Sequence, residues 1–281
     1  MSMNGTYIGI DFGGTNIRAA RVTNGVMVEN HNAPTPLNPK SCEETLNALV
    51  NVAASVMDDS VEGIGVGVPS VVDREKGIVY NVANIPYWDE VPLKDILQER
   101  FSVPVYINND ANCFAIAERY FGEGQSFENF VGITLGTGLG GGIIQKGHLL
   151  ADANCGSGEF GHVPYLDHDI EYYCSGSFFM HEYGVTGKEM YQRALSQDKI
   201  ALEAYRKLGS HLSVAIKIII LTVDPEMIVF GGSVATAYPL FEEKMIEGLR
   251  DFRFPRSVEK LKIRYSNLKH AGVLGAVSLC Y

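Results

Sequence analysis

The sequence predicts an α/β protein with a duplicated core. The first observation is a pair of glycine-rich turns, DFGGTN at residues 11–16 and LGTGLGGG at residues 135–142, each preceded by a short apolar strand. The second is that each turn leads into a hairpin, closed by NG at residues 24–25 and by KG at residues 146–147. The third is that strands and helices alternate along the rest of the chain. A turn and hairpin that recur in this way are typical of a repeated unit.

The predicted elements follow from the spacing of the apolar residues. In chain order we expect hairpin arms at residues 17–22 and 26–28, a helix at 42–57, a strand at 64–68, a helix at 93–101, a strand at 103–107, a helix at 111–120, hairpin arms at 142–145 and 148–150, a loop-rich stretch at 152–184, mostly helix over 188–223, strands at 227–230 and 261–265, and a helix at 271–279. No low-complexity linker separates them, so the boundary between domains lies within compact structure. We place it just after Asp110, which gives a small α/β lobe at residues 1–110 and a large α/β lobe at residues 111–270.

Composition and charge argue against several classes of protein. The chain has 281 residues, 46% of them hydrophobic, and a formal charge of −10 without a basic run, which argues against nucleic-acid binding. The five cysteines are odd in number and irregularly spaced, which fits reduced thiols better than a disulfide framework. The longest apolar stretch, residues 214–223, contains Lys217 and is too short to span a bilayer. With no signal peptide evident, we expect a cytoplasmic enzyme that binds no membrane.

Both glycine turns are candidate phosphate-binding sites. Glycine lets backbone N–H groups approach an anion without a Cβ in the way, and a neighbouring threonine hydroxyl adds a donor. The alternative is that these are ordinary hairpin glycines, which need no ligand. The first turn leads into a strand rather than a helix, which separates it from Walker and Rossmann loops.

A strand, an acidic glycine turn and a second strand resemble the actin, hexokinase and Hsp70 ATPase superfamily. This resemblance implies a two-lobed, ribonuclease H-like α/β fold with a duplicated core and a central cleft between the lobes. It also implies that Asp11 faces the magnesium-bound phosphates of a nucleotide.

Polar side chains that suit a sugar site occur in three places. Asn109 and Asp110 follow the strand at 103–107, where open α/β sheets place ligand residues. The alternative is that they only cap the following helix. Glu159 and His162 lie on a glycine-rich loop, and Glu182 lies on an aromatic segment. Each of these three also has a structural alternative, a hydrogen-bonded histidine or a solvated glutamate.

Taken together, these motifs resemble the ROK family of sugar kinases and repressors over nearly the whole chain. The motifs on which this resemblance rests are DFGGTN at 11–16, NDAN at 109–112, the turn at 135–142, GEFGH at 158–162 and GGS at 231–233. The resemblance implies that Asp110 is the general base, which takes the proton from the sugar 6-hydroxyl. The residues that it implies for other sugar hydroxyls are Asn84, Asn109, Glu159, His162 and Glu182. Those that it implies for the nucleotide are Asp11, Gly13, Gly14, Thr15, Asn16, Thr137, Gly138, Gly231 and Gly232.

The resemblance implies a hexose kinase that uses ATP and Mg²⁺, forms a homodimer and packs its C-terminal helix, residues 271–281, back on the N-terminal lobe. Glucose is the first candidate substrate, and N-acetylglucosamine, N-acetylmannosamine, mannose, fructose and allose are the alternatives. Converging carboxylates, amides and an imidazole suit sugar hydroxyls, which both donate and accept hydrogen bonds. A sugar-sensing repressor is a rival function, although repressors of the family carry a winged helix ahead of the phosphate turn. A bare binding or ATPase module is a second rival, but it has no need of Asp110 as a base.

The chain departs from the family at its zinc site. Family members usually bind zinc through the histidine of the GEFGH element and three cysteines in a C-x-C-G-x-x-G-C-x-E run. The alignment on Gly176 and Glu182 places at the cysteine positions Tyr173, Ser175 and Met180. Tetrahedral structural zinc needs four nitrogen or sulfur ligands, so we predict no structural zinc and expect His162 to bind sugar instead.

Overall fold

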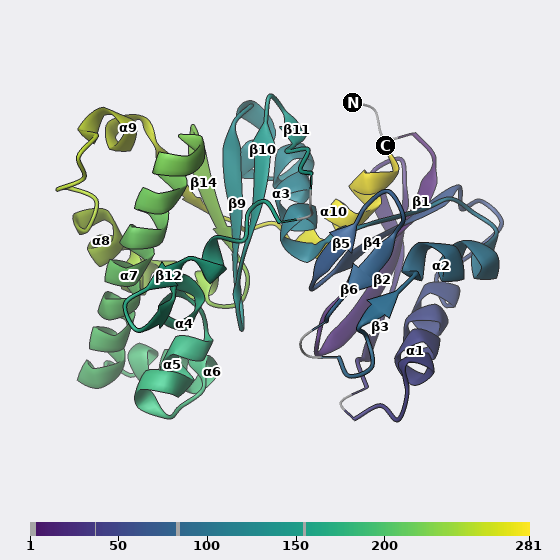
Figure 1. Cartoon of the computed structure of the whole chain (residues 1–281), viewed down its shortest axis with the longest axis horizontal. Helices are drawn as coiled ribbons and strands as arrows, with labels where there is room; N and C mark the ends of the chain where they lie inside the picture. Colours follow the sequence, from purple (N-terminus) through teal and green to yellow (C-terminus); the bar gives the residue numbers. More distant parts are fainter. Residues whose placement is uncertain (1–3, 37, 83–84, 154–155) are drawn as a thin grey trace. The chain divides into compact units, whose positions relative to one another are not determined.

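The computed structural model describes residues 4–36, 38–82, 85–153 and 156–281. Within these residues, two five-stranded sheets that share one topology form the cores of the protein (Figure 1). The first sheet contains β1 (Thr6–Phe12), β2 (Asn16–Thr23), β3 (Val26–Pro34), β4 (Gly63–Val68) and β8 (Val105–Asn109). The second contains β9 (Phe130–Leu135), β10 (Leu139–Gln145), β11 (His148–Leu149), β14 (Met227–Gly231) and β15 (Lys262–Tyr265). The orders are β3-β2-β1-β4-β8 and β11-β10-β9-β14-β15. In each sheet an antiparallel meander is followed by two parallel pairings, which confirms the predicted duplication.

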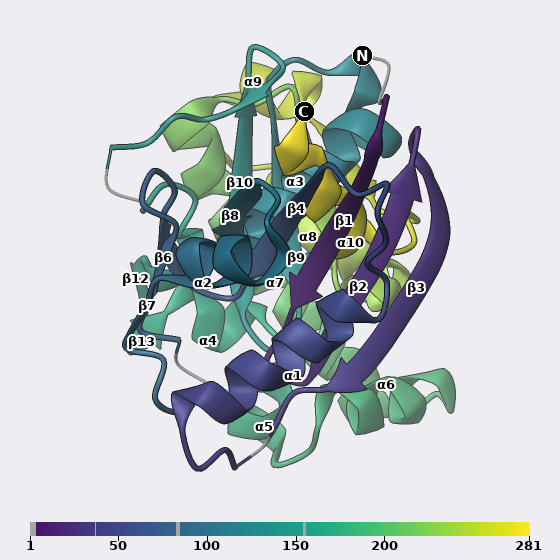
Figure 2. The same ribbon diagram turned by 90° about the vertical axis from the view of Figure 1, so that its right-hand side faces the viewer.

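Helices cover both faces of the first sheet. They are α1 (Cys42–Ala54), α2 (Leu93–Phe101), α3 (Asp110–Phe121) and α10 (Ala271–Val277). Because side chains alternate between the faces of a strand, Ile8 and Ile10 of β1 share one face, and both belong to a buried cluster with Leu49 of α1. Figure 2 shows α1 lying across the strands of this sheet.

Helix α10 packs against the other face at very close range. A Cβ at Gly65 of β4 would lie 1.8 Å from the carbonyl oxygen of Ala276, so only glycine fits there. A Cβ at Gly275 would lie 1.8 Å from the carbonyl oxygen of Cys113 in α3. The C-terminal helix therefore joins β4 and α3 into one packed layer.

The chain divides into two compact units, Met1–Tyr120 with Ala151–Gly156 and Leu268–Tyr281, and Phe121–Leu150 with Ser157–Asn267. This division differs from the boundary expected after Asp110, because α3 stays with the first unit. The physical reason is the contact between α3 and α10, which no local sequence pattern signals. The terminal segment that contains α10 also belongs to the first unit.

The second unit contains a larger set of helices than the first among the described residues. They are α4 (Ile170–Cys174), α5 (Ser177–Tyr183), α6 (Gly187–Leu195), α7 (Lys199–Val223), α8 (Tyr238–Glu247) and α9 (Pro255–Lys260). The buried side of α7 includes Leu208 and Ile216, which share a hydrophobic cluster with Phe230 of β14. Asp198 caps α7 by accepting a 2.8 Å hydrogen bond from the N–H of Ile200.

Residues 156–184 are more ordered than predicted. They include α4 and α5, and Asp169 caps α4 through a 2.9 Å bond from the N–H of Tyr172. Phe178 and Phe179 are buried, so tertiary packing stabilises α5. Helices as short as α4 and α5 contain too few residues to show a helical spacing of apolar residues in the sequence. The remaining elements are β5 (Val71–Asp73), β6 (Ile78–Tyr80), β7 (Glu90–Val91), β12 (Pro164–Tyr165), β13 (His168–Asp169) and the 3-10 helices η1 (Glu123–Ser126), η2 (Phe160–His162), η3 (Ala235–Ala237) and η4 (Ser278–Cys280).

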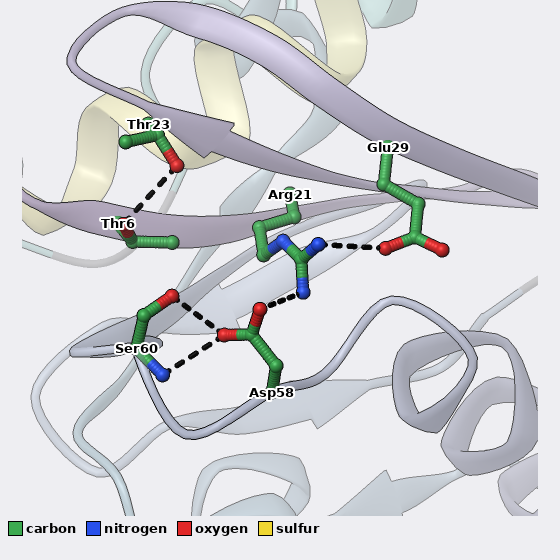
Figure 3. Close-up of polar contacts among 6 residues, drawn as sticks. All are labelled: Thr6, Arg21, Thr23, Glu29, Asp58 and Ser60. Carbon is green, nitrogen blue, oxygen red and sulfur yellow. Dashed lines mark hydrogen bonds and ion pairs between the residues drawn. The ribbon is translucent and has the colours of Figure 1, made fainter.

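Polar contacts hold the hairpin side of the first sheet (Figure 3). The guanidinium of Arg21 on β2 pairs with Glu29 on β3 at 2.9 Å and also with Asp58. Hydrogen bonds from Ser60 hold the pKa of Asp58 below its usual value. These ion pairs are partly exposed, so each contributes little to stability, but they fix Arg21 in a structural role.

Within the described ranges, the chain has no helix that is long and apolar enough to cross a membrane.

Candidate active site

The first glycine turn carries an acidic side chain. Asp11 lies on β1 directly opposite Arg18 on β2, and the Arg18 guanidinium donates to its carboxylate at 3.0 Å. The turn closes with a 3.0 Å bond from the N–H of Gly13 to the carbonyl of Asn16. Both charged side chains are reached by solvent, with 21% of Asp11 and 49% of Arg18 exposed. The Asp11 carboxylate is thus accessible beside backbone that suits an anion.

Asp11 fits the chemistry of a magnesium ligand, because Mg²⁺ prefers carboxylate oxygen. The described residues contain no group of three or more His, Cys, Asp or Glu side chains that could hold a metal by themselves. Mg²⁺ is commonly held by one or two carboxylates together with substrate phosphates and water, so a single carboxylate is compatible with it.

Asn109 and Asp110 lie at the junction of β8 and α3. The Asn109 side-chain oxygen accepts bonds from the N–H of Ala111 at 2.8 Å and of Asn112 at 3.3 Å, so its predicted capping alternative is realised. Its amide donates to the carbonyl of Ser70 at 3.2 Å. One oxygen of the Asp110 carboxylate accepts from the N–H of Ala111 at 2.8 Å. The start of α3 thus holds the Asp110 carboxylate in a fixed orientation.

In the second unit, Glu159 and His162 lie beside each other on the predicted loop. Glu159 Oε2 is 3.7 Å from His162 Nε2, and His162 Nδ1 is 3.9 Å from Asp169. Burial raises the pKa of Glu159, a neighbouring Glu171 adds to that increase, and His162 opposes it. The Glu159 carboxylate is therefore partly desolvated, whereas 66% of the neighbouring His162 side chain is exposed.

Glu171 lies beside the predicted site residues Gly138 and Glu159 but is not itself predicted from the sequence. Its carboxylate accepts a 2.8 Å bond from the N–H of Leu139, and a Cβ at Gly138 would lie 2.4 Å from it. Glu171 therefore connects the second glycine turn with the pair formed by Glu159 and His162. The bond to Leu139 spans 32 positions of sequence, so no local motif signals it.

The structure gives Glu182 a different place. This exposed residue of α5 hydrogen-bonds to Tyr172, whose pKa is raised by desolvation and by Glu182, and it lies near enough to influence His211. Glu171 lies near enough to Glu159 to influence its pKa, and the role of Glu182 as a sugar ligand stays a prediction. The predicted sugar ligand Asn84 lies outside the described residues.

Aromatic rings and histidines surround the segment where the family usually binds zinc. The ring of Tyr172 stacks between His168 at 3.8 Å and His181 at 4.4 Å. The hydroxyl of Tyr165 lies 3.1 Å from His211 Nδ1, and burial lowers the pKa of His211. Ring stacking and the contact between Tyr165 and His211 thus order this segment through packing.

We expect purified protein to contain no stoichiometric zinc by elemental analysis, and we expect a zinc-selective chelator to leave its activity unchanged. The reason is that Tyr173, Ser175 and Met180 cannot replace cysteine thiolates as ligands. A content of about one zinc per chain, with activity lost on its removal, would contradict this prediction.

The second glycine turn forms part of a pocket of about 550 Å³ within the second unit. Two hydrogen bonds fix the shape of this turn. The N–H of Gly176 donates to the carbonyl of Gly136 at 2.7 Å, and the Ser177 hydroxyl donates to the carbonyl of Thr137 at 2.7 Å. The lining residues include Thr137, Lys188, Tyr191, Tyr205, Ser233 and Val234. Gly231 and Gly232 immediately precede Ser233, so the two predicted nucleotide segments meet at this pocket. A volume of this size suits a small-molecule ligand.

The model of the ROK family matches residues 7–281. The chain belongs to the ROK family. A ROK relative, the glucokinase of Halalkalibacterium halodurans, is 29% identical over 96% of this chain and 93% of its own length. Another, the xylose repressor of Caldicellulosiruptor bescii, is 28% identical over 77% of this chain and 62% of its own length.

Solved ROK structures also resemble the chain. A ROK family glucokinase from Streptomyces griseus, in complex with glucose and AMPPNP, matches with a TM-score of 0.83 and 27% identity, covering 98% of this chain and 99% of that one. This match confirms for the ROK chain the two-lobed actin-like ATPase fold that its sequence predicts.

Proposed function

We propose that this ROK protein transfers the γ-phosphoryl group of ATP to the 6-hydroxyl of a hexose, with glucose as the first candidate. The observation that carries the proposal is the Asp110 carboxylate, which is held at the start of α3 by the N–H of Ala111. Asp110 accepts the proton of the 6-hydroxyl while the hydroxyl oxygen bonds to the γ-phosphorus. The bond from that phosphorus to the bridging oxygen breaks, and ADP leaves.

We assign the phosphates of ATP to the two glycine turns and the adenosine to the pocket in the second unit. Phosphoryl transfer depends mainly on in-line positioning and on neutralisation of charge, which backbone N–H groups and a bound metal ion supply. Mg²⁺ neutralises phosphate charge when it is bound, and Asp11 is the residue that we assign to it. The pairing of Asp11 with Arg18 leaves a carboxylate oxygen beside the first turn.

We assign recognition of the sugar hydroxyls to Glu159, Glu171 and His162, together with Asn109. Two carboxylates and an imidazole accept and donate hydrogen bonds, as a ring of hydroxyls requires. The raised pKa of Glu159 reflects a desolvated environment, in which a hydrogen bond from a sugar hydroxyl stabilises the carboxylate. Asn109 also caps α3 and so fixes the start of the helix that carries Asp110.

A sugar-sensing role without catalysis is the second candidate, because a xylose repressor is among the relatives. An assay of ADP release with ATP, Mg²⁺ and a panel of hexoses and N-acetylhexosamines distinguishes a sugar kinase from a non-catalytic sugar sensor. A kinase releases ADP only when its own sugar is present. Saturable sugar binding without sugar-dependent ADP release would instead favour the sensor. The predicted homodimer and cytoplasmic location stay predictions.

A further inference from the structure

Thr35 is a buried polar residue that contacts the first glycine turn from outside the predicted motif. It follows β3 and is only 2% exposed. Its hydroxyl donates to the carbonyl of Gly13 at 2.7 Å, and its N–H donates to the carbonyl of Thr15 at 3.0 Å. The pairing of β2 with β3 places Asn16 opposite Pro34, and this register brings Thr35 alongside the turn. Thr35 is therefore joined to the turn at two points.

These two bonds determine the orientation of the peptide groups in the turn. In a trans peptide the C=O and the following N–H point in opposite directions. Because the Thr35 hydroxyl holds the carbonyl of Gly13, the N–H of Gly14 points away from Thr35. Among the described residues the Gly14 N–H makes no hydrogen bond, which leaves it available to an anion.

We infer that Thr35 is a positioning residue for the phosphoryl donor, whose hydroxyl aims the Gly14 N–H at a phosphate oxygen of ATP. The inference rests on the proposed function, in which the first glycine turn binds the phosphates. Thr35 does not touch the nucleotide in this arrangement but acts through the peptide between Gly13 and Gly14. Loss of the hydroxyl frees that peptide to rotate and lowers the fraction of turns that can donate to the phosphate.

Thr35→Val removes the hydroxyl while keeping the backbone N–H and nearly the same shape. We expect the KM for MgATP to rise about tenfold, as one lost positioning hydrogen bond implies, while the KM for the sugar changes less than about twofold. The Kd of AMPPNP, measured by calorimetry, should rise in parallel. Thr35→Ser keeps the hydroxyl and should restore both values to within about threefold of the unsubstituted protein.

The matched control is Thr45→Val. Thr45 of α1 is fully buried, and its hydroxyl has no hydrogen-bond partner within the described part of the chain. This control also loses a buried threonine hydroxyl, so it should leave the KM for MgATP unchanged. A substitution that merely leaves a fraction of the protein molecules unfolded lowers the apparent kcat but not this KM, because KM does not depend on the concentration of active enzyme.

An unchanged KM for MgATP and an unchanged Kd of AMPPNP in Thr35→Val would overturn the inference and leave the proposed function intact. Equal increases in Thr35→Val and Thr45→Val would overturn it as well. Failure of the unsubstituted protein to bind AMPPNP would instead count against the proposed function itself.

Discussion

Asp110→Asn should reduce kcat by about a hundredfold or more, while the KM for the sugar stays within severalfold of its normal value. The amide oxygen can still accept the bond that the Asp110 carboxylate accepts from the N–H of Ala111. The amide cannot accept the proton of the 6-hydroxyl, however. The variant should therefore fold and bind sugar but turn over very slowly, which steady-state kinetics with ATP and the preferred hexose can measure.

Asp198→Asn is the matched control for this experiment. Asp198 also accepts a backbone N–H at the start of a helix, α7, but we assign it no part in the reaction. Its kcat should stay within about twofold of the unsubstituted protein, since loss of charge at a cap affects mainly stability. Near-normal turnover by a folded Asp110→Asn protein would remove Asp110 from the role of base.

Gly65→Ala should destabilise the first unit by at least about 3 kcal/mol, the upper part of the range for overpacking a core. The added Cβ would lie 1.8 Å from the carbonyl oxygen of Ala276, which is backbone and cannot rotate away as a side chain can. Either α10 moves off β4 or the sheet distorts. We expect a lower Tm and a lower denaturant midpoint, measured by circular dichroism.

Gly63→Ala provides the comparison within the same strand. Its Cβ would lie 3.3 Å from the nearest atom, the carbonyl oxygen of Pro104, so a small shift accommodates it. We expect a loss below about 1 kcal/mol. Equal Tm values for the two variants would show that α10 does not pack on β4 at this close range.

The duplicated core could be predicted because its signals are local. A glycine turn followed by a hairpin is a pattern of a few residues, and it occurs at residues 11–16 and again at residues 135–142. The strands next to these turns are short runs of apolar residues, which can also be recognised directly in the sequence. The order of the elements therefore follows from patterns that do not depend on distant contacts, whereas the two-lobed fold follows from the family resemblance.

The parts of the site that escaped prediction depend on distant contacts. Glu171 reaches the N–H of Leu139 across 32 positions, and Thr35 reaches Gly13 across 22. Asn109 shows a related difficulty, because a cap and a ligand look the same in sequence and only its bonds to α3 reveal the cap. The resemblance to the family implies Glu182 as a sugar ligand, and its contact with Tyr172 is not visible in the sequence.

The identity of the reaction product tests the proposed function most directly. Purified protein would be incubated with ATP, Mg²⁺ and the hexose that releases ADP fastest, and the product examined by phosphorus–proton correlation NMR. We predict one product with phosphate on O6, formed in equal amount to ADP and lost in Asp110→Asn. Phosphate on another oxygen, free phosphate in place of a sugar phosphate, or no ADP release with any sugar would contradict it.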